Sequence, residues 1–222
     1  MATTTVASEV QDLSSVKSRI DSEIDSLLAT LPKPEDLTPS QRRGIIARYS
    51  AVLEGNFIYW MTAAYLSARS EAARPIMIDN LHEEIRDCHP EMLRRFAIAA
   101  HAYPTDTDAM AVRDGLAQVR GFLGRLQGVQ NILMMGFFES YIQRFMSYLA
   151  DLAVIQGSNE LEYTDVHGVC DIAHSEGLLL AYAAETAINP PDPSEDLFEG
   201  VSKLRDLIQV INGAGHASAA TT

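Results

Sequence analysis

The stretch Val-His-Gly-Val-Cys-Asp-Ile-Ala-His, residues 166–174, holds three potential metal ligands in one largely apolar segment. On an α-helix each residue advances by about 100°, so His167, Asp171 and His174 emerge within a stripe about 60° wide. Two imidazoles and a carboxylate on one stripe form a surface that can bind a metal ion. The alternative is an ordinary polar helix face with two solvated histidines.

Two glutamates lie in other apolar segments, where an ionised side chain is costly. Glu139 stands inside Ile-Leu-Met-Met-Gly-Phe-Phe-Glu-Ser-Tyr-Ile, residues 132–142, and Glu54 stands between Leu53 and the apolar run 57–61. A buried carboxylate needs a cation or several hydrogen-bond donors, because its desolvation costs several kcal/mol. Either glutamate could instead lie on the polar stripe of an amphipathic helix. Together with the histidine stripe, the two favour a ligand set drawn from several helices.

The composition favours one globular domain and a small partner. A chain of 222 residues that is 47% hydrophobic can fill a single core. The net charge of −13 argues against binding to nucleic acid or to anionic membranes. No segment reaches the roughly 20 uninterrupted apolar residues of a membrane span, and the N-terminus lacks the pattern of a secretory signal. We therefore expect a cytoplasmic protein that binds a small molecule, without nucleic-acid or membrane partners.

The two cysteines, Cys88 and Cys170, form no CxxC pair. They indicate neither a disulfide framework nor a thiolate zinc site. We expect both to be reduced packing residues, although Cys170 adjoins Asp171 and could lie near the metal ligands.

Apolar residues recur at three- and four-residue steps along most of the chain, and prolines and glycines separate the periodic segments. Thr38, Pro39 and Gln41 fit a capping box with proline at the first helical position. No strand pattern or interdomain linker stands out, so the expected fold class is all-α, with one domain over residues 1–212 and a flexible tail over 213–222. The expected helices cover residues 10–27, 39–68, 76–88 and 91–101, one or two helices within 108–156, then 164–187, and a last helix that Ser194 caps and that ends near 211.

The junction at His89 has a chemical consequence. His89 precedes Pro90, which disfavours the α conformation at His89 and predicts a helix break there. Glu84 and His89 would point about 140° apart on an unbroken helix, but a break allows both to turn toward one metal ion. An ordinary helix-to-helix junction explains the local sequence equally well.

The order and spacing of these residues resemble the haem-oxygenase-like diiron oxidases and oxygenases. The resemblance runs from Glu54 to His174 and rests on the Asn-Leu-His-Glu-Glu segment that leads to His89-Pro90, on Glu139 within an apolar helix, and on His-x3-Asp-x2-His. It implies a seven-helix bundle in which two non-haem irons occupy the pocket. Carried over by position, the implied ligands are Glu54, Glu84, His89, Glu139, His167, Asp171 and His174. Glu83 competes with Glu84, which stands four residues after Asn80 as in the family pattern.

The implied chemistry is O2-dependent oxidation. Mixed carboxylate and imidazole donors without thiolate favour iron or manganese over structural zinc, and more than four candidate ligands suggest two ions. The expected cofactors are two Fe(II) ions per chain, with O2 as co-substrate and an external reductant. A ferritin-type bundle would need two Glu-x-x-His units on separate helices, and only Asp171 and His174 have such a spacing. Haem oxygenase itself would need a lone axial histidine, and the cofactor-free thiaminase-like relatives give no reason for so many aligned ligands.

The substrate expected from the resemblance is a small aliphatic amino acid, oxidised at a C–H bond with desaturation or C–N ring closure, such as azetidine formation, in specialised metabolism. Such a substrate needs a cation for its carboxylate and an acceptor for its amine, for which Arg144 and Glu185 are candidates, and Tyr59 is a candidate wall of the pocket. An N-oxygenase or a fatty-acid decarboxylase of the same fold is the near alternative. A non-catalytic metal-binding helical module is the alternative from another class. The sequence leaves a homodimer open.

Overall fold

The computed structural model describes residues 13–213, and every regular element within that range is helical. No strand occurs among these residues, so the all-α prediction is confirmed. They form eight α-helices and one short 3-10 turn, while the haem-oxygenase-like topology stays a prediction. The elements are α1 (Leu13–Leu28), η1 (Pro34–Asp36), α2 (Pro39–Ser67), α3 (Ala73–Arg86), α4 (His89–Ala99), α5 (Asp106–Leu123), α6 (Gly128–Ile155), α7 (Glu162–Ile188) and α8 (Glu199–Ile211).

Local sequence signals account for several of the helix ends. The predicted capping box at α2 is present: the Gln41 amide donates to the Thr38 hydroxyl, and the Thr38 amide donates to the Gln41 side chain at 2.8 Å. Thr105 and Asp108 form the same motif at the start of α5. The backbone amides of a first helical turn have no partner within the helix, and side chains that accept hydrogen bonds from them fix where the helix begins.

The segment 108–156, predicted as one or two helices, forms two, since α5 ends at Leu123 and α6 begins at Gly128. The predicted start of the last helix was wrong. Ser194 does not cap the last helix: its amide and hydroxyl both donate to Asp192, and α8 begins later, at Glu199. The tail predicted for 213–222 lies, apart from Gly213, outside the described residues, as does the predicted start of the first helix at Val10.

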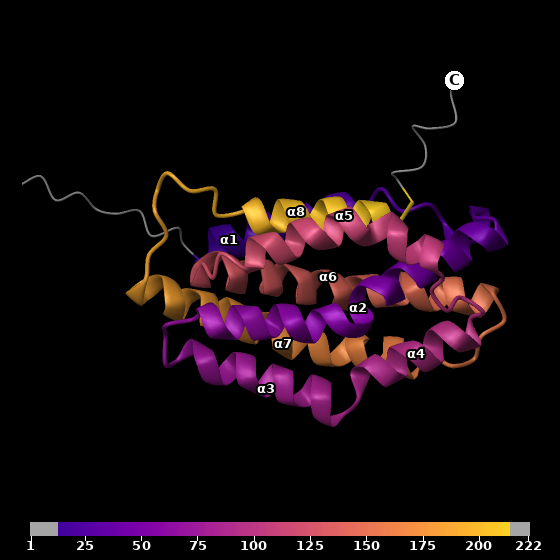
Figure 1. Cartoon of the computed structure of the whole chain (residues 1–222), viewed down its shortest axis with the longest axis horizontal. Coiled ribbons are helices and arrows are strands. Elements are labelled where there is room, and N and C mark those ends of the chain that lie inside the picture. The colour runs from indigo at the N-terminus through magenta and orange to yellow at the C-terminus, as the bar shows by residue number, and fades with distance from the viewer. Residues whose placement is uncertain (1–12, 214–222) are drawn as a thin grey trace, which may run out of the picture.

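The predicted break between α3 and α4 is present but lies slightly earlier than expected. Cys88, with φ of 57°, adopts the left-handed conformation, and His89 is already the first residue of α4. Pro90 then falls in the first helical turn, where its missing N–H costs nothing. The chain therefore bends between Glu84 and His89 without a long loop (Figure 1).

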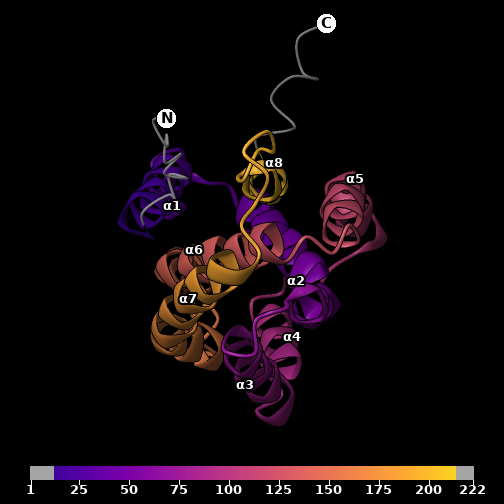
Figure 2. The ribbon, with the colours of Figure 1, turned by 90° about the vertical axis from the view of Figure 1, so that its left-hand side faces the viewer.

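The helices surround α6, whose first half is the centre of the core. Residues 128–139 are all buried, as expected for a helix that is apolar on every side. α6 packs along α7 and across α2, while α3 and α4 pack against both α2 and α7 (Figure 1). Viewed end on, α5 and α8 lie on the other side of α2 and α6, away from α3 (Figure 2). The space enclosed by α2, α3, α4, α6 and α7 holds most of the predicted ligands. Among the described helices, none has the length and apolar character needed to cross a membrane.

Candidate metal centre

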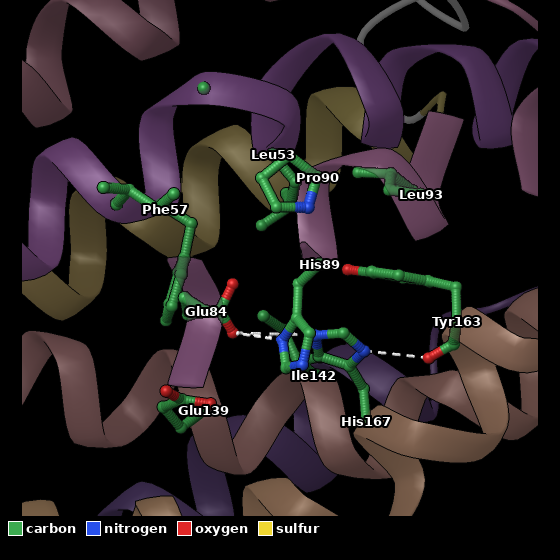
Figure 3. A pocket seen from close by; sticks show the side chains of 12 residues that line it. Leu53, Phe57, Glu84, His89, Pro90, Leu93, Glu139, Ile142, Tyr163 and His167 are labelled. Carbon is green, nitrogen blue, oxygen red and sulfur yellow. Dashed lines mark hydrogen bonds and ion pairs between the residues drawn. The ribbon is translucent and has the colours of Figure 1, made fainter. Parts of the chain in front are cut away.

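The first ligand cluster consists of Glu84, His89 and His167, all buried (Figure 3). Glu84 Oε1 lies 2.8 Å from His89 Nδ1 and 3.7 Å from His167 Nε2. One nitrogen or oxygen atom from each residue lies within 4.8 Å of the other two. The left-handed Cys88 makes this possible, since it turns the end of α3 and the start of α4 toward the same point on α7.

A backbone hydrogen bond fixes the orientation of His167. Its Nδ1 lies 2.8 Å from the Tyr163 carbonyl oxygen one turn earlier on α7, so Nδ1 carries the hydrogen. The other ring nitrogen, Nε2, then faces Glu84 with a free lone pair whenever the ring is neutral. Metal-binding histidines are commonly held in this way, with one nitrogen donating to a carbonyl or carboxylate and the other bound to the ion.

The second ligand cluster consists of Glu139, Asp171 and His174. His174 Nδ1 lies 3.6 Å from Asp171 Oδ1 and 3.8 Å from Glu139 Oε1. Asp171 is 0% exposed, and its Oδ2 has no hydrogen-bond partner among the described residues; the same holds for His174 Nδ1. Buried polar atoms without partners are rare and call for an explanation, and a bound cation supplies one. His167 and Asp171 are one turn apart on α7, so the two clusters are neighbours.

Two polar neighbours orient the second cluster. Asn80 Nδ2 donates to Glu139 Oε1 at 2.7 Å, and Glu83 Oε2 lies 3.1 Å from His174 Nε2. Glu83 therefore holds the outer nitrogen of His174, while Glu84 faces inward toward His89 and His167. This geometry separates the two adjacent glutamates: Glu84 has the position of a ligand, and Glu83 the position of an orienting partner.

The two cysteines have different surroundings. Cys170 is half-buried, and its thiol donates to Asp171 Oδ1 at 3.2 Å. Burial and the Asp171 carboxylate raise the pKa of Cys170, which keeps this thiol neutral and a hydrogen-bond donor. Cys88 is exposed, so the prediction that both cysteines are packing residues is wrong for Cys88.

The low pKa of Glu84 keeps its carboxylate ionised, which places a negative charge at the centre of the first cluster. Burial raises the pKa of this carboxyl, but the facing imidazoles of His167 and His89 outweigh burial and lower it to about 2. The same pairing acts on the histidine: burial lowers the pKa of His167, while Glu84 and Asp171 raise it above its ordinary value. Glu84 is therefore ionised under all ordinary conditions, as a metal ligand must be.

In the second cluster, the raised pKa values of Glu139 and His174 mean that both groups hold their protons tightly. Burial raises the pKa of Glu139 well above its ordinary value, and the nearby Asp171 carboxylate raises it further. Burial lowers the pKa of His174, but Asp171, Glu139 and Glu83 together raise it to about 9. Excess negative charge in a dry site is balanced by protons or by a cation, so this cluster has the electrostatics of a cation site.

A narrow cavity adjoins the ligands. Its walls combine the first cluster and Glu139 with Leu53, Gly55, Phe57, Ile58, Pro90, Leu93, Ile142 and Tyr163 (Figure 3). The cavity is small, with a volume of about 20 Å³, which suits a metal ion with one or two small ligands. Gly55 is exposed and Ile58 and Pro90 are half-buried, whereas the other wall residues are buried. The cavity therefore reaches the surface between α2 and α4.

Glu54 is the one implied ligand that the structure does not bring to either cluster. Its carboxylate binds the guanidinium of Arg94 on α4, with Arg94 Nε 2.9 Å from Glu54 Oε1. It is not part of the cavity wall, although its neighbours Leu53 and Gly55 are. The ion pair across to α4 explains how an ionised group is tolerated in this apolar segment.

The structure brings none of the three expected substrate-binding residues to the cavity. Arg144 forms an ion pair with Asp25 of α1. Glu185 is buried, but its Oε2 accepts hydrogen bonds from the backbone amides of Arg69 and Ser70 at 2.9 and 2.7 Å, and so ties the α2–α3 connection to α7. Tyr59 is 48% exposed, on the outer face of α2. These residues were chosen by the charge or size of their side chains, and that choice does not say which face of α2, α6 or α7 meets the cavity.

Sequence reasoning did not predict the orienting role of three side chains that organise the site. Asn80 and Glu83 hold Glu139 and His174, and Arg94 holds Glu54. The position of Asn80 four residues before Glu84 gave one signal, since it places both side chains on one face of α3. No local pattern marks Arg94, because its partner lies 40 residues away in the sequence.

The donor set fits metal ions of the first transition series. Six side chains, three carboxylates and three imidazoles, form two adjacent clusters, the thiol of Cys170 lies within ligand distance of Asp171 and His174 in the second one, and two of the ligand atoms have no hydrogen-bond partner among residues 13–213. Such donors can bind iron, manganese or zinc, and the geometry by itself does not choose among them. No protein-family model matches this chain, and no significant match to a curated protein is found.

Proposed function

We propose that this chain is a non-haem diiron enzyme that uses O2 and an external reductant to oxidise an aliphatic small molecule. The observation that carries the proposal is the pairing of two buried clusters one helical turn apart on α7, each with imidazole and carboxylate donors. Each cluster would hold one iron. Glu54 would supply a seventh ligand if it left Arg94.

Charge balance supports two ferrous ions. Glu84, Glu139 and Asp171 contribute three negative charges, and the imidazoles bind metal as neutral groups. Two Fe(II) ions bring four positive charges, so the six ligands leave a net charge of about +1, which Glu54 would cancel. The excess over four ligands argues against a structural zinc site, and the raised pKa of Cys170 keeps its thiol protonated beside Asp171.

The chemistry that bound iron supplies is the reduction of O2, for which two ferrous ions provide two electrons. The protein residues perform the remaining tasks. Tyr163 and Asn80 orient His167 and Glu139, and Glu83 holds His174 so that its Nδ1 faces inward. Leu53, Phe57 and Ile142 exclude water from the cavity beside the ligands, which favours reaction of a C–H bond over side reactions with solvent.

The proposed substrate is a small aliphatic amino acid, oxidised by desaturation or C–N ring closure. The apolar wall formed by Leu53, Phe57, Ile58, Leu93 and Ile142 favours an aliphatic chain beside the ligands. The cavity wall contains no Lys or Arg, and this observation favours a second candidate, a fatty acid whose chain enters the cavity while its carboxylate stays outside.

The central test is the removal of one ligand. His167→Ala is expected to abolish binding of one iron and all turnover while helical content stays near that of the wild type, because α7 is held by its packing along α6 and not by this one side chain. The matched control is His82→Ala, since His82 is exposed on α3. Iron content after anaerobic loading, circular dichroism and O2 consumption are the measurements. An active His167→Ala enzyme would contradict the proposal.

Product analysis separates the candidate reactions. The iron-loaded protein is incubated with O2, ascorbate and either the common amino acids or saturated fatty acids, and products are identified by mass spectrometry. Loss of two hydrogens from an amino acid indicates desaturation or ring closure, and loss of CO2 from a fatty acid indicates decarboxylation. Metal binding without O2 consumption under any of these conditions would leave a non-catalytic metal-binding module.

A further inference from the structure

The cavity has one opening, and an ion pair lies beside it. Among the wall residues only Gly55, Ile58 and Pro90 reach the surface, so the opening lies where α2 passes α4. Glu54 directly precedes Gly55 and lies one turn before Ile58, and Arg94 lies one turn after Pro90. Both side chains of the pair are therefore next to the opening, on its two opposite helices.

The ion pair is accessible to a ligand. The side chains of Arg94 and Glu54 are 43% and 22% exposed, while the adjacent wall residues Leu93 and Leu53 are buried. Two nitrogens of Arg94, Nε and one terminal nitrogen, both bind Glu54 Oε1, and the other terminal nitrogen binds Glu91. A guanidinium presents a planar fork of donors that matches a carboxylate, and Glu54 now occupies that fork.

Exposed ion pairs exchange partners at small cost. A pair that is partly solvated contributes at most about 1 kcal/mol, because water competes for both charges. An incoming carboxylate whose aliphatic chain packs against Ile58 and Pro90 at the mouth of the cavity gains from the burial of that chain, which Glu54 cannot match. Displacement of Glu54 by such a ligand is therefore favourable.

We infer that Arg94 is the binding residue for the carboxylate of an aliphatic substrate, and that this carboxylate replaces Glu54 on the guanidinium. The aliphatic chain then lies along Gly55 and Ile58 at the mouth of the cavity, on the side that faces the two clusters. Glu54, released from Arg94, is then free to turn toward the metal centre. The inference rests on the proposed function only in this last step, since the carboxylate site itself needs no metal.

Coupling between substrate and metal follows from the exchange. Glu54 serves either Arg94 or the metal centre, so a substrate that takes Arg94 raises the affinity for iron, and iron raises the affinity for the substrate by the same factor.

The test measures binding of octanoate and of L-isoleucine to the metal-free full chain by isothermal titration calorimetry. The two probes share the carboxylate and an aliphatic chain, and they distinguish a fatty acid from an amino acid. Octanamide and L-isoleucinamide, which lack the negative charge, serve as ligand controls. At least one acid is expected to bind, and its amide to bind about tenfold more weakly.

Three variants separate the roles of the residues. Arg94→Gln is expected to weaken binding of the acid about tenfold or more, because the charge-assisted hydrogen bonds are lost. Arg95→Gln is the matched control, since Arg95 is the next residue, equally exposed, and pairs with Glu162 away from the cavity wall. Glu54→Gln is expected to strengthen binding several-fold in the metal-free protein, because the competing carboxylate is gone. If the ion pair were purely structural, Arg94→Gln and Glu54→Gln would not change the affinity for the acid in opposite directions.

Failure of carboxylate binding at Arg94 can be told apart from failure of the proposed diiron function. Binding by Arg94→Gln equal to that of the wild type, or no binding of either acid by the wild type, would overturn the inference even if iron-dependent O2 consumption is found. Carboxylate binding that requires Arg94 in a chain without O2 chemistry would support the subsite and remove the diiron enzyme. If Arg94→Gln does not fold, Arg94→Lys, which keeps the charge but loses the fork, and Glu54→Gln still test the exchange.

Discussion

His174 has two different environments at its two ring nitrogens. Nε2 lies 3.1 Å from Glu83, near the surface of the site, and Nδ1 faces the buried carboxylates of Asp171 and Glu139. Three carboxylates around one imidazole raise its pKa to about 9, against the burial that lowers it. At neutral pH without metal, this ring therefore carries a proton that a metal ion must displace.

Metal affinity should consequently depend on pH. The apparent affinity for Mn(II) is expected to rise by up to about tenfold per pH unit until about pH 9, because below that pH a metal ion must displace the proton held by His174. Titration calorimetry in a series of buffers measures both the affinity and the number of protons released. In Glu83→Gln, which removes one of the carboxylates, the rise should end at a lower pH. An affinity that is constant from pH 7 to pH 9 would contradict this assignment.

The same proton affects the stability of the metal-free protein. The folded state binds the His174 proton more tightly than the unfolded state does, so its contribution to the free energy of unfolding is complete below about pH 6.5 and is lost as the pH rises through about 9. The raised pKa of Glu139 has the same sign. Bound metal removes both protons and should abolish this decline.

At the scale of the elements, the junction of α3 and α4 decides whether the first cluster exists. Glu84 lies near the end of one helix and His89 begins the next, and the single left-handed residue Cys88 turns the chain between them. A non-glycine residue in this conformation costs about 1–2 kcal/mol, so the surrounding packing maintains the turn. The position of both ligands therefore depends on one backbone conformation.

Cys88→Val tests this dependence. A β-branched residue is strongly disfavoured at positive φ, so we expect a loss of about 1–2 kcal/mol in the free energy of unfolding, measured with denaturant, together with weaker metal binding. The matched control is His101→Val, because His101 also has positive φ, 54°, just after α4 but is not part of the cavity wall. It should lose similar stability and keep its metal affinity. Equal loss of affinity in both variants would argue that the junction has no special role.

At the scale of the whole molecule, five helices enclose the cavity and only the gap between α2 and α4 admits a ligand. Gly55 lies at that gap, and a Cβ placed on it would meet no atom within 4 Å. The opening thus depends on a residue without a side chain on a helix that has no local need for glycine. Access to the metal centre is a property of how α2 and α4 pack, and of this one small residue.

Gly55→Leu should close the opening. We expect at least tenfold weaker binding of octanoate or L-isoleucine and lower turnover, with unchanged iron content, since no ligand is altered. Gly121→Leu is the matched control: Gly121 is exposed on α5, and a Cβ there also meets nothing within 4 Å. Both changes should stabilise their helices by about 0.5–1 kcal/mol. A Gly55→Leu protein with full substrate binding would mean that ligands enter elsewhere.

The sequence alone determined the features that a single helix can encode. The all-α class, the capped start of α2 and the stripe of His167, Asp171 and His174 follow from local periodicity, and local periodicity is readable without a fold. The break before Pro90 was predicted within two residues, because proline restricts its immediate neighbours.

Only the tertiary structure decided which partners meet across helices. The contact between Glu83 and His174, which lies 91 residues away, distinguished Glu84 as the candidate ligand from Glu83. Glu54 pairs with Arg94, 40 residues away, and Glu185 accepts hydrogen bonds from backbone amides 115 and 116 residues away. Neither side chain therefore has the role that the sequence suggested. A carboxylate binds whichever donors the fold brings to it, and that choice is set by how helices pack, because packing joins residues that no local pattern connects.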